Sequence, residues 1–285
     1  MSDAGWGAIR AAYLQYSMIC LPGQNLTPEQ QVAFAARFGP LDDHREDPSY
    51  RLPGYPEIYL LGNFKRDDGR VSKTRDVGRG WHTDHSYTTR PTEISMLYCQ
   101  SVPPVGGTTM WSSGYMAYDE LSPKMKTIVE DLEAVHDFAW YFTQPTVYNK
   151  PKVRSVDSIR ERYPAVVHPL VRVHPETGRK ALYLSEALIS HIVGLGYDES
   201  RSILNMLLRH ALRPEFTYRH TCTPNDLVFW DNRCTMHNAP ADYVHSLDTP
   251  RQMYRLTVLG TPFGRYLDEE AGRKMTEQAA EKAAA

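Results

Sequence analysis

Residues 80–87 read Gly-Trp-His-Thr-Asp-His-Ser-Tyr, and they carry the strongest chemical signal in the chain. His82 and Asp84 stand two positions apart, so on a β-strand their side chains would project toward the same face. An imidazole and a carboxylate on one face supply two members of the 2-His-1-carboxylate triad, which leaves open positions on non-haem Fe(II). An isolated His-x-Asp pair is more often solvated or hydrogen-bonded, so the interpretation depends on what else the chain supplies.

A candidate for the third ligand lies far downstream. The apolar, strand-like run 227–230 is followed by Asp-Asn-Arg-Cys-Thr-Met and then by His237. We predict that folding brings His237 to the His-x-Asp pair. Asp231 and Asn232 either orient the strand that carries His237 or are ordinary turn residues.

The composition is typical of a globular cytoplasmic protein. With 285 residues, 41% of them hydrophobic, the chain can bury the core of one large domain or two small ones. A net charge of -2 without a basic stripe argues against nucleic acid as a partner. The N-terminus lacks a signal-peptide layout, and no apolar run reaches the roughly 18 residues of a membrane span. The four cysteines form no Cys-x-x-Cys pair, which argues against a structural zinc site or disulfides and suits a reducing compartment. They are Cys20, Cys99, Cys222 and Cys234.

Short apolar runs separated by turns predict a mainly β fold, with helical buttresses around a jelly-roll-like core. Residues 27–30, Thr-Pro-Glu-Gln, have the capping-box pattern with proline at the first helical position. Further helices are expected over 3–15, from 122 to about 132, and over 198–212. The expected strands are 16–21, 58–61, 93–100, 108–111, 227–230 and 254–259, with a hairpin formed by 166–173 and 181–184.

A single domain is expected over 1–268, with a polar excursion at 145–165 and an Ala/Glu/Lys-rich tail at 269–285. The tail has almost nothing to bury, so we expect a frayed helix or disorder there. Residues 64–79 are charged and glycine-bearing without periodicity, which fits either a mobile lid or a plain surface loop.

Arg251 and Arg255 stand four positions apart at the start of the last predicted strand. In a regular strand both side chains point the same way, and a buried pair of like charges requires anions. Because arginine binds carboxylates through a bidentate fork, the pair suggests a receptor for one or two carboxylates or a sulfonate. The alternative is that one or both are solvated or paired with Asp248 or Glu269.

Four motifs follow one another along the chain. They are His-Thr-Asp at 82–84, Gly-Gly-x-Thr-x-Trp at 106–111, Trp-Asp-Asn-Arg-x-x-x-His at 230–237 and Arg-x-Met-x-Arg at 251–255. Together they resemble the Fe(II)/2-oxoglutarate-dependent dioxygenases of the taurine dioxygenase and 2,4-dichlorophenoxyacetate dioxygenase (TauD/TfdA) type. The resemblance extends from Leu21 to about Phe263 and implies a double-stranded β-helix core, which agrees with the jelly-roll interpretation.

The resemblance assigns roles to the matching residues. The implied iron ligands are His82, Asp84 and His237. The distal carboxylate of 2-oxoglutarate would be held by Thr109 and Arg251. The acidic group of the substrate would meet Arg255, His44 and the backbone N–H of His85.

The reaction that the resemblance implies uses Fe(II), 2-oxoglutarate and O₂, with ascorbate as reductant in vitro, and releases succinate and CO₂. The substrate would be a small anionic organic acid, aryloxyalkanoate- or sulfonate-like, that becomes hydroxylated. Alternatives are a taurine, alkylsulfonate or alkyl sulfate dioxygenase, a non-catalytic 2-oxoglutarate-binding β-helix protein, and a zinc hydrolase. Family members commonly form dimers or tetramers, so a homo-oligomer is expected. Four aromatic residues could line an aromatic pocket, although packing in the core is the favoured interpretation. They are Tyr87, Tyr98, Trp140 and Phe142.

Several departures from the taurine enzyme weaken taurine as the substrate. The region 77–80 contains no Asn, and residues 45–47, Arg-Glu-Asp, replace the Tyr and Pro expected after His44. The chain also begins after the additional N-terminal strand that is usual in the family. Residues 170–180 look closer to the aryloxyalkanoate enzymes.

Overall fold

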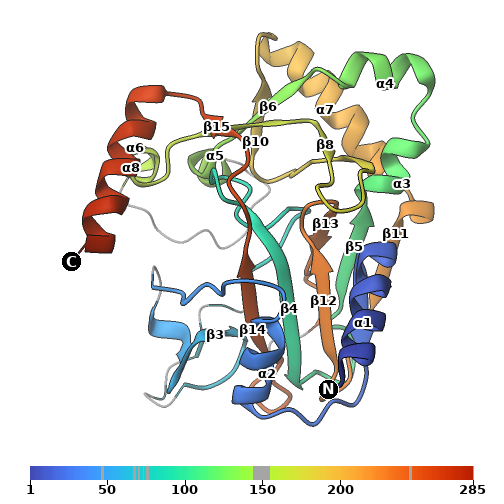
Figure 1. Cartoon of the computed structure of the whole chain (residues 1–285), viewed down its shortest axis with the longest axis vertical. Coiled ribbons are helices and arrows are strands. Elements are labelled where there is room, and N and C mark those ends of the chain that lie inside the picture. Colours follow the sequence, from blue (N-terminus) through green and yellow to red (C-terminus); the bar gives the residue numbers. More distant parts are fainter. Residues whose placement is uncertain are drawn as a thin grey trace.

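The computed structural model describes residues 1–45, 48–66, 69, 71, 72, 74, 77–143, 155–243 and 246–284. At its centre lies a six-stranded antiparallel sheet with the order β1-β12-β4-β14-β3-β2 (Figure 1). Its strands are β1 (Met18–Leu21), β2 (Arg51–Leu52), β3 (Tyr55–Gly62), β4 (Thr92–Ser101), β12 (Leu227–Asp231) and β14 (Gln252–Leu259). Apart from β2 and β3, each pair of neighbouring strands joins an N-terminal strand to a C-terminal one, so this sheet joins the two halves of the sequence.

Strand β12 shows why this sheet forms the core. All of its residues are buried, and alternate side chains leave opposite faces of a strand. Phe229 packs on one face with Tyr13, whereas Trp230 packs on the other face with Trp111. Burying one such large apolar side chain stabilises the fold by about 1.5–3 kcal/mol. The sheet is therefore covered by apolar side chains on both faces.

Two N-terminal helices, α1 (Asp3–Tyr16) and α2 (Pro28–Ala35), pack against the Phe229 face. The Ser2 hydroxyl caps α1 by accepting a hydrogen bond from the Gly5 N–H. Thr27 and Gln30 form the predicted capping box at the start of α2. These contacts satisfy N–H groups that a helix start would otherwise leave unpaired.

Three smaller antiparallel sheets complete the β structure, with the orders β10-β6-β7-β15, β11-β5-β13 and β8-β9. Trp111 on β5 lies edge-to-face against Trp230, with ring centroids 5.4 Å apart, and this contact joins the three-stranded sheet to the six-stranded one. The strands are β5 (Thr109–Ser113), β6 (Glu133–His136), β7 (Val166–Pro169), β8 (Val171–Val173), β9 (Lys180–Leu182), β10 (Ile189–Ile192), β11 (Thr217–His220), β13 (Thr235–Asn238) and β15 (Arg265–Tyr266).

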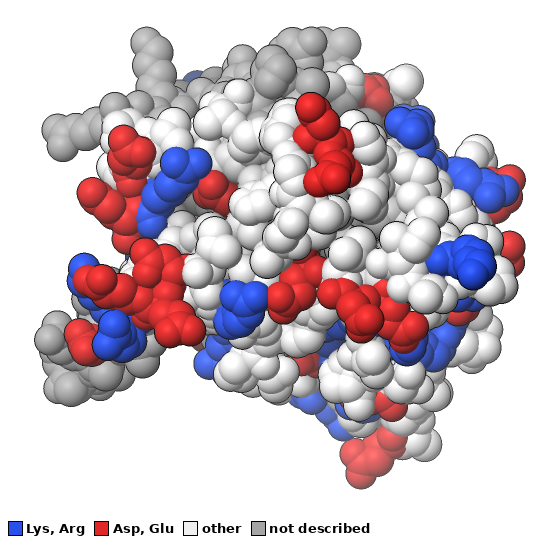
Figure 2. Space-filling model, turned by 90° about the horizontal axis from the view of Figure 1, so that it is seen from above, with Lys and Arg blue, Asp and Glu red and all other residues white. Residues whose placement is uncertain are grey.

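Helix α7 (Tyr197–Ala211) covers a second apolar cluster, into which it buries Leu204, Leu207 and Ala211. This helix confirms the helix predicted over 198–212. In the view of Figure 2, acidic and basic side chains are interspersed over the surface. The remaining helices are α3 (Gly114–Asp119), α4 (Pro123–Val129), α5 (Phe138–Thr143), α6 (Val156–Arg162), α8 (Glu269–Ala284) and two 3-10 turns, η1 (Pro48–Tyr50) and η3 (Pro214–Phe216).

Some expectations about local structure were wrong. The stretch 80–87 is not a strand, because residues 84–87 form a turn and His85 takes a left-handed φ of 52° that an extended strand does not contain. The helix expected to reach about 132 ends at Val129, since β6 begins at Glu133. Only β8 and β9 form the expected hairpin, whereas β7 pairs with β6 and β15.

The mainly β architecture with helical buttresses is confirmed, and the tail forms helix α8. The excursion expected at 145–165 contains α6, but residues 144–154 lie outside the described residues, as do 67, 68, 70, 73, 75 and 76 of the possible lid. The single domain over 1–268 stays a prediction. Within the described part of the chain, no helix is both long and apolar enough to span a membrane.

Candidate metal and substrate site

The three predicted metal ligands lie together. Ligand atoms of His82, Asp84 and His237 are all within 4.8 Å of one another. The His82 Nε2 atom is 3.6 Å from Asp84 Oδ1, and the His237 Nε2 atom is 3.6 Å from Asp84 Oδ2. Two imidazoles and one carboxylate converging on one point form a donor set that could hold a divalent metal ion.

A backbone bridge aligns the two histidines. The His82 N–H donates to the His237 carbonyl at 3.0 Å, and the His237 N–H donates to the His82 carbonyl at 2.8 Å. Their ring centroids are consequently only 4.1 Å apart. The His82 Nδ1 atom lies 2.8 Å from the Gly80 carbonyl, an arrangement that keeps Nε2 free to bind a metal.

The electrostatics also suit a metal ligand set. Burial and the neighbouring His82 ring lower the pKa of His237 to about 3, so its imidazole is neutral at pH 7. Burial opposes ionisation of Asp84, but Arg255 and the two imidazoles bring the pKa of its carboxyl well below the ordinary range. His237 therefore offers a neutral nitrogen and Asp84 a negative oxygen, as metal ligands must.

A small polar network positions Asp84. The Ser95 hydroxyl donates to Asp84 Oδ2 at 2.5 Å. The Asn232 side chain accepts the Asp84 N–H at 3.3 Å and donates to the Ser95 hydroxyl at 3.0 Å. Asn232 is thus more than a turn residue. Ser95 was missed in the sequence, because its place on β4 gives no local sign of the contact.

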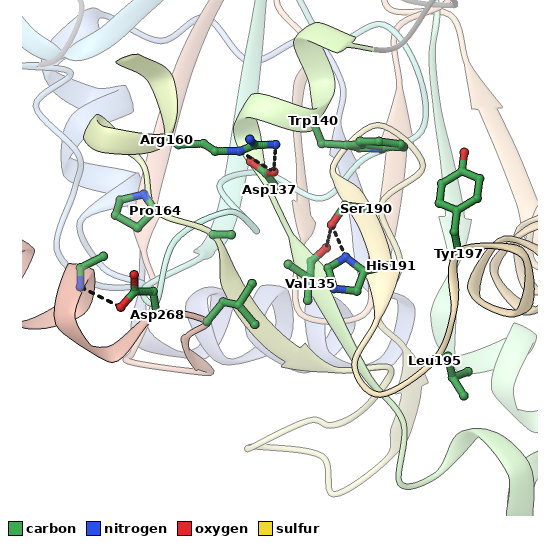
Figure 3. Close-up of a pocket in the computed structure, with 13 residues that line it drawn as sticks. Val135, Asp137, Trp140, Arg160, Pro164, Ser190, His191, Leu195, Tyr197 and Asp268 are labelled. Atoms are coloured by element: carbon green, nitrogen blue, oxygen red, sulfur yellow. Dashed lines mark hydrogen bonds and ion pairs between the residues drawn. The ribbon is translucent and has the colours of Figure 1, made fainter. Parts of the chain in front are cut away.

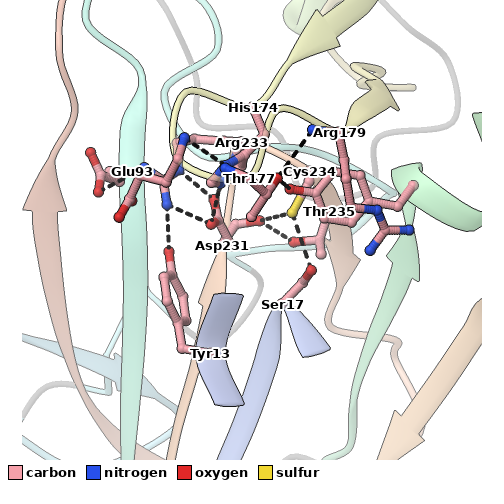
Figure 4. Close-up of polar contacts among 12 residues, drawn as sticks. Tyr13, Ser17, Glu93, His174, Thr177, Arg179, Asp231, Arg233, Cys234 and Thr235 are labelled. Atoms are coloured by element: carbon pink, nitrogen blue, oxygen red, sulfur yellow. Dashed lines mark hydrogen bonds and ion pairs between the residues drawn. The ribbon is translucent and has the colours of Figure 1, made fainter. Parts of the chain in front are cut away.

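Asp231 belongs to a separate buried network (Figure 4). Its carboxylate lies 2.9 Å from His174 Nε2 and 2.7 Å from a terminal nitrogen of Arg233. Arg233 also reaches Glu93 at 3.0 Å and Glu176 at 2.8 Å. This network fixes the connection between β12 and β13, and hence the strand that carries His237.

Arg251 is buried beside the glycine-rich turn that precedes β5. Its backbone N–H donates to Asn63 Oδ1 at 2.7 Å, and its Nε donates to the Gly107 carbonyl at 3.1 Å. Thr109 follows on β5, and its hydroxyl is buried without a hydrogen-bond partner among the described residues. A buried guanidinium near an unpaired hydroxyl is chemically suited to a carboxylate.

Arg255 lies on the triad side of β14. A terminal nitrogen is 3.8 Å from Asp84 Oδ1, and its Nε donates to the Thr257 hydroxyl at 3.3 Å. Arg255 therefore pairs with Asp84, and not with Asp248 or Glu269, the two exposed acids considered as alternatives. The pairing of β14 with β4 shifts between Gln252 and Met253, so the regular-strand argument for a common direction of the two arginines does not apply.

His44 and His85 are close enough to Arg255 to feel its charge. Burial and that charge lower the pKa of His44 to about 4, and the same two causes lower the pKa of His85. His44 Nε2 is buried without a partner in the described part of the chain, whereas His85 Nδ1 lies 2.9 Å from the Thr92 hydroxyl. Arg255 therefore carries the positive charge of this group, beside two imidazoles that are neutral at pH 7.

An aromatic wall continues from His85. The Tyr87 ring stacks on Phe138 with centroids 4.3 Å apart, and Tyr163 packs edge-on at 5.6 Å. Phe138 and Tyr163 were not singled out from the sequence. Tyr98 packs in the core, as favoured, where its hydroxyl donates to the Gln24 carbonyl.

A cavity of about 560 Å³ lies elsewhere, between β6, β10, α5, α6 and the start of α8 (Figure 3). It is lined by Trp140, His191, Tyr197 and the Arg160–Asp137 ion pair, among others. None of the predicted site residues lines it. Trp140, a candidate for the aromatic wall, thus belongs to this cavity.

Comparisons with known proteins identify the family. The model of the taurine catabolism dioxygenase TauD, TfdA family matches residues 1–257. The chain is 34% identical over 270 residues to the (S)-phenoxypropionate/alpha-ketoglutarate-dioxygenase of Sphingobium herbicidovorans, covering 92% of this chain and 88% of that protein. It is 34% identical over 253 residues to the alpha-ketoglutarate-dependent 2,4-dichlorophenoxyacetate dioxygenase of Cupriavidus pinatubonensis. This match covers 85% of this chain and 84% of that protein.

Among solved structures, AAD-2 in complex with Mn(II) and N-oxalylglycine matches with a TM-score of 0.77 at 30% identity. The match covers 92% of this chain and 90% of that one.

Proposed function

The chain belongs to the TauD/TfdA family of 2-oxoglutarate-dependent non-haem iron dioxygenases, with its double-stranded β-helix fold, and we propose that it hydroxylates a small aromatic organic acid of the aryloxyalkanoate type. One observation carries this proposal. Arg255 lies 3.8 Å from Asp84, at the edge of a three-ligand cluster and beside the Tyr87–Phe138 wall. A carboxylate anchored there would leave an aromatic group against aromatic side chains.

His82, Asp84 and His237 are the proposed iron ligands. When bound, Fe(II), 2-oxoglutarate and O₂ supply the oxidising chemistry, in which 2-oxoglutarate becomes succinate and CO₂ and one oxygen atom enters a substrate C–H bond. The backbone bridge between the two histidines fixes the spacing of their rings before metal arrives. Ser95 holds the carboxylate of Asp84, and Asn232 holds both the Ser95 hydroxyl and the Asp84 backbone N–H.

Arg251 and Thr109 are the proposed receptors for the distal carboxylate of 2-oxoglutarate. Asn63 holds the Arg251 backbone and the Gly107 carbonyl holds its Nε, so the buried side chain has little entropy left to lose on binding. The buried, unpaired Thr109 hydroxyl would gain the partner that it lacks among the described residues.

Arg255, His44 and the backbone N–H of His85 are the proposed contacts to the substrate's acidic group. Because burial and the Arg255 charge keep both imidazoles neutral at pH 7, the guanidinium supplies the fixed charge. The His44 ring and the His85 backbone N–H would supply hydrogen bonds. Tyr87, Phe138 and their neighbours would hold an aryl ring by stacking. Hydroxylation of the carbon beside the ether oxygen gives a hemiacetal or, at a substituted carbon, a hemiketal, which collapses to a phenol and a 2-oxo acid.

We further propose a cytoplasmic homo-oligomer, either a dimer or a tetramer. Native mass spectrometry of the purified protein would measure its assembly, and cell fractionation would test its compartment. A mass equal to one chain would remove the oligomer from this proposal.

The test of function is succinate formation with Fe(II), 2-oxoglutarate and ascorbate across a panel of acids. The panel contains phenoxyacetate, both enantiomers of phenoxypropionate, taurine and an alkyl sulfate. We expect an aryloxyalkanoate to raise succinate well above the uncoupled background, with release of the matching phenol.

Two controls accompany this assay. His82→Ala should abolish succinate formation with every acid, because it removes a metal ligand. Stimulation by taurine or the alkyl sulfate alone would overturn the aryl acid as substrate. If metal-loaded protein made no succinate at all, a non-catalytic 2-oxoglutarate-binding protein would replace the enzyme.

A further inference from the structure

We propose that Cys20, His220 and Asp226 form a second metal site, for a borderline divalent cation such as Zn²⁺, at the end of the core sheet. The thiol, imidazole and carboxylate ligand atoms all lie within 4.8 Å of one another. Cys20 Sγ is 3.6 Å from His220 Nε2, which is 3.7 Å from Asp226 Oδ2. A single ion could therefore meet all three donors after small side-chain movements.

Three different elements bring these donors together. Cys20 lies on β1, opposite Val228 of β12 in the six-stranded sheet. His220 ends β11, the edge strand of the three-stranded sheet. Asp226 lies in the turn that leads directly into β12. An ion bound there would tie the edge strand β11 to two strands of the core.

The donors are already oriented. Asp226 Oδ2 accepts the Thr223 N–H at 2.8 Å, and Asp226 Oδ1 accepts the Thr223 hydroxyl at 2.9 Å, so the carboxylate cannot swing away. His220 Nδ1 lies 3.1 Å from the Tyr218 hydroxyl, which leaves Nε2 directed toward Cys20 and Asp226. Outer contacts of this kind are what fix a ligand's orientation in known metal sites.

The ligand set selects the type of metal. A thiolate, an imidazole and a carboxylate suit Zn²⁺, which usually takes four tetrahedral ligands. The Cys20 thiol must lose its proton to bind the ion, so metal binding would release that proton to solvent.

A second thiol-bearing cluster provides the contrast. His174, Asp231 and Cys234 also lie within 4.8 Å of one another, but all three are fully buried, and Arg233 already neutralises Asp231 (Figure 4). A cation entering there would meet that guanidinium. At the proposed site the His220 side chain keeps 14% of its surface exposed, so an ion can enter.

The test is a Co(II) titration of the reduced, chelator-stripped protein without air. The iron triad contains no thiolate, so a near-ultraviolet thiolate-to-cobalt charge-transfer band reports a thiol-bearing site and not the triad. We expect this band in the wild type and in His82→Ala, and we expect Cys20→Ser to remove it. Cys234→Ser is the matched control and should keep the band at full height.

His220→Gln gives an independent answer if Cys20→Ser does not fold. Loss of a direct ligand should weaken Co(II) binding at this band by at least about tenfold. A folded wild type without the band would overturn the proposal. So would a band that survives Cys20→Ser with unchanged affinity, or one that disappears in Cys234→Ser. These readouts do not depend on catalysis, so they stand apart from the outcome of the succinate assay.

Discussion

At the scale of single residues, the site separates two guanidiniums that the sequence presents as a pair. Arg251 is held by Asn63 and Gly107, away from direct contact with the triad ligands, whereas Arg255 contacts Asp84. Two arginines with such different surroundings should bind two different anions. Their separate roles can be measured in the kinetics.

Arg251→Ala should raise KM for 2-oxoglutarate roughly ten- to a hundredfold, because a charge-assisted hydrogen bond contributes about 1.5–3 kcal/mol. Arg255→Ala should instead raise KM mainly for the organic acid. Steady-state kinetics with each substrate varied in turn distinguishes the two. Arg213→Ala, at an exposed position, is the control and should change neither constant. The opposite pattern would exchange the two assignments.

Ser95→Ala should lower Fe(II) affinity about ten- to a hundredfold, because Asp84 loses the hydroxyl that orients its carboxylate. Ser112→Ala is the matched control, because it also removes a buried hydroxyl. The Ser112 hydroxyl donates to the Ala211 carbonyl at 2.7 Å and does not contact the triad. Metal titration of both variants measures the effect. Equal affinity in the two variants would remove Ser95 from the metal site.

At the scale of elements, the sequence predicted the features that local residue patterns encode, such as helix caps and buried strands. It missed the features that depend on contacts between segments far apart in the chain. The Thr27–Gln30 capping box and the apolar run of β12 carry their own signals, and both were found. The His-Thr-Asp stretch has no such signal, because its shape comes from the bridge to His237. The triad was nevertheless predicted correctly as a cluster, since its motif order resembled a family. Ser95 and the Cys20–His220–Asp226 cluster depend on contacts between remote elements, which spacing alone does not reveal.

Gly62, at the end of β3, shows how one element positions another. Its φ is 129°, and a Cβ there would lie 1.8 Å from the Arg251 carbonyl oxygen. Gly62→Ala should therefore destabilise the fold by more than about 3 kcal/mol, by backbone strain and steric clash together, and should weaken 2-oxoglutarate binding. Urea unfolding and 2-oxoglutarate titration provide the measurements.

Gly54→Ala is the control for this substitution. Gly54 also has a positive φ, of 84°, but a Cβ there would meet nothing within 4 Å. Gly54→Ala should therefore lower the free energy of unfolding by the backbone strain alone, about 1–3 kcal/mol, and should leave 2-oxoglutarate binding unchanged. If both alanine variants lost the same stability, contact between Gly62 and Arg251 would not matter.

At the scale of the whole molecule, stability should depend on pH through buried histidines. His136 is fully buried, and its ring nitrogens have no hydrogen-bond partner among the described residues. Burial, together with the neighbouring His168, lowers the pKa of His136 well below its ordinary value. Burial likewise lowers the pKa of His168 to about 4. Both rings are therefore neutral in the folded protein at pH 5, whereas the unfolded chain binds protons below about pH 6.5.

Folding stability should consequently be complete above about pH 6.5 and should fall on acidification, because the unfolded state then binds more protons than the folded state. Between pH 6.5 and 5, each histidine should remove up to about 2 kcal/mol. Urea unfolding at pH 7 and pH 5 measures the loss. His136→Phe should reduce that loss by about the share of one histidine, and an unchanged loss would show that His136 is protonated in the folded state.

The pairing of Asp84 with Asn232, 148 residues apart in the chain, has a consequence for biosynthesis. A ribosome makes His82 and Asp84 long before it makes Asn232 and His237, and a contact of such long range forms only after the loop between its ends has closed. A growing chain therefore holds an incomplete donor set for most of its synthesis. Iron binding by the complete donor set must therefore follow synthesis of His237.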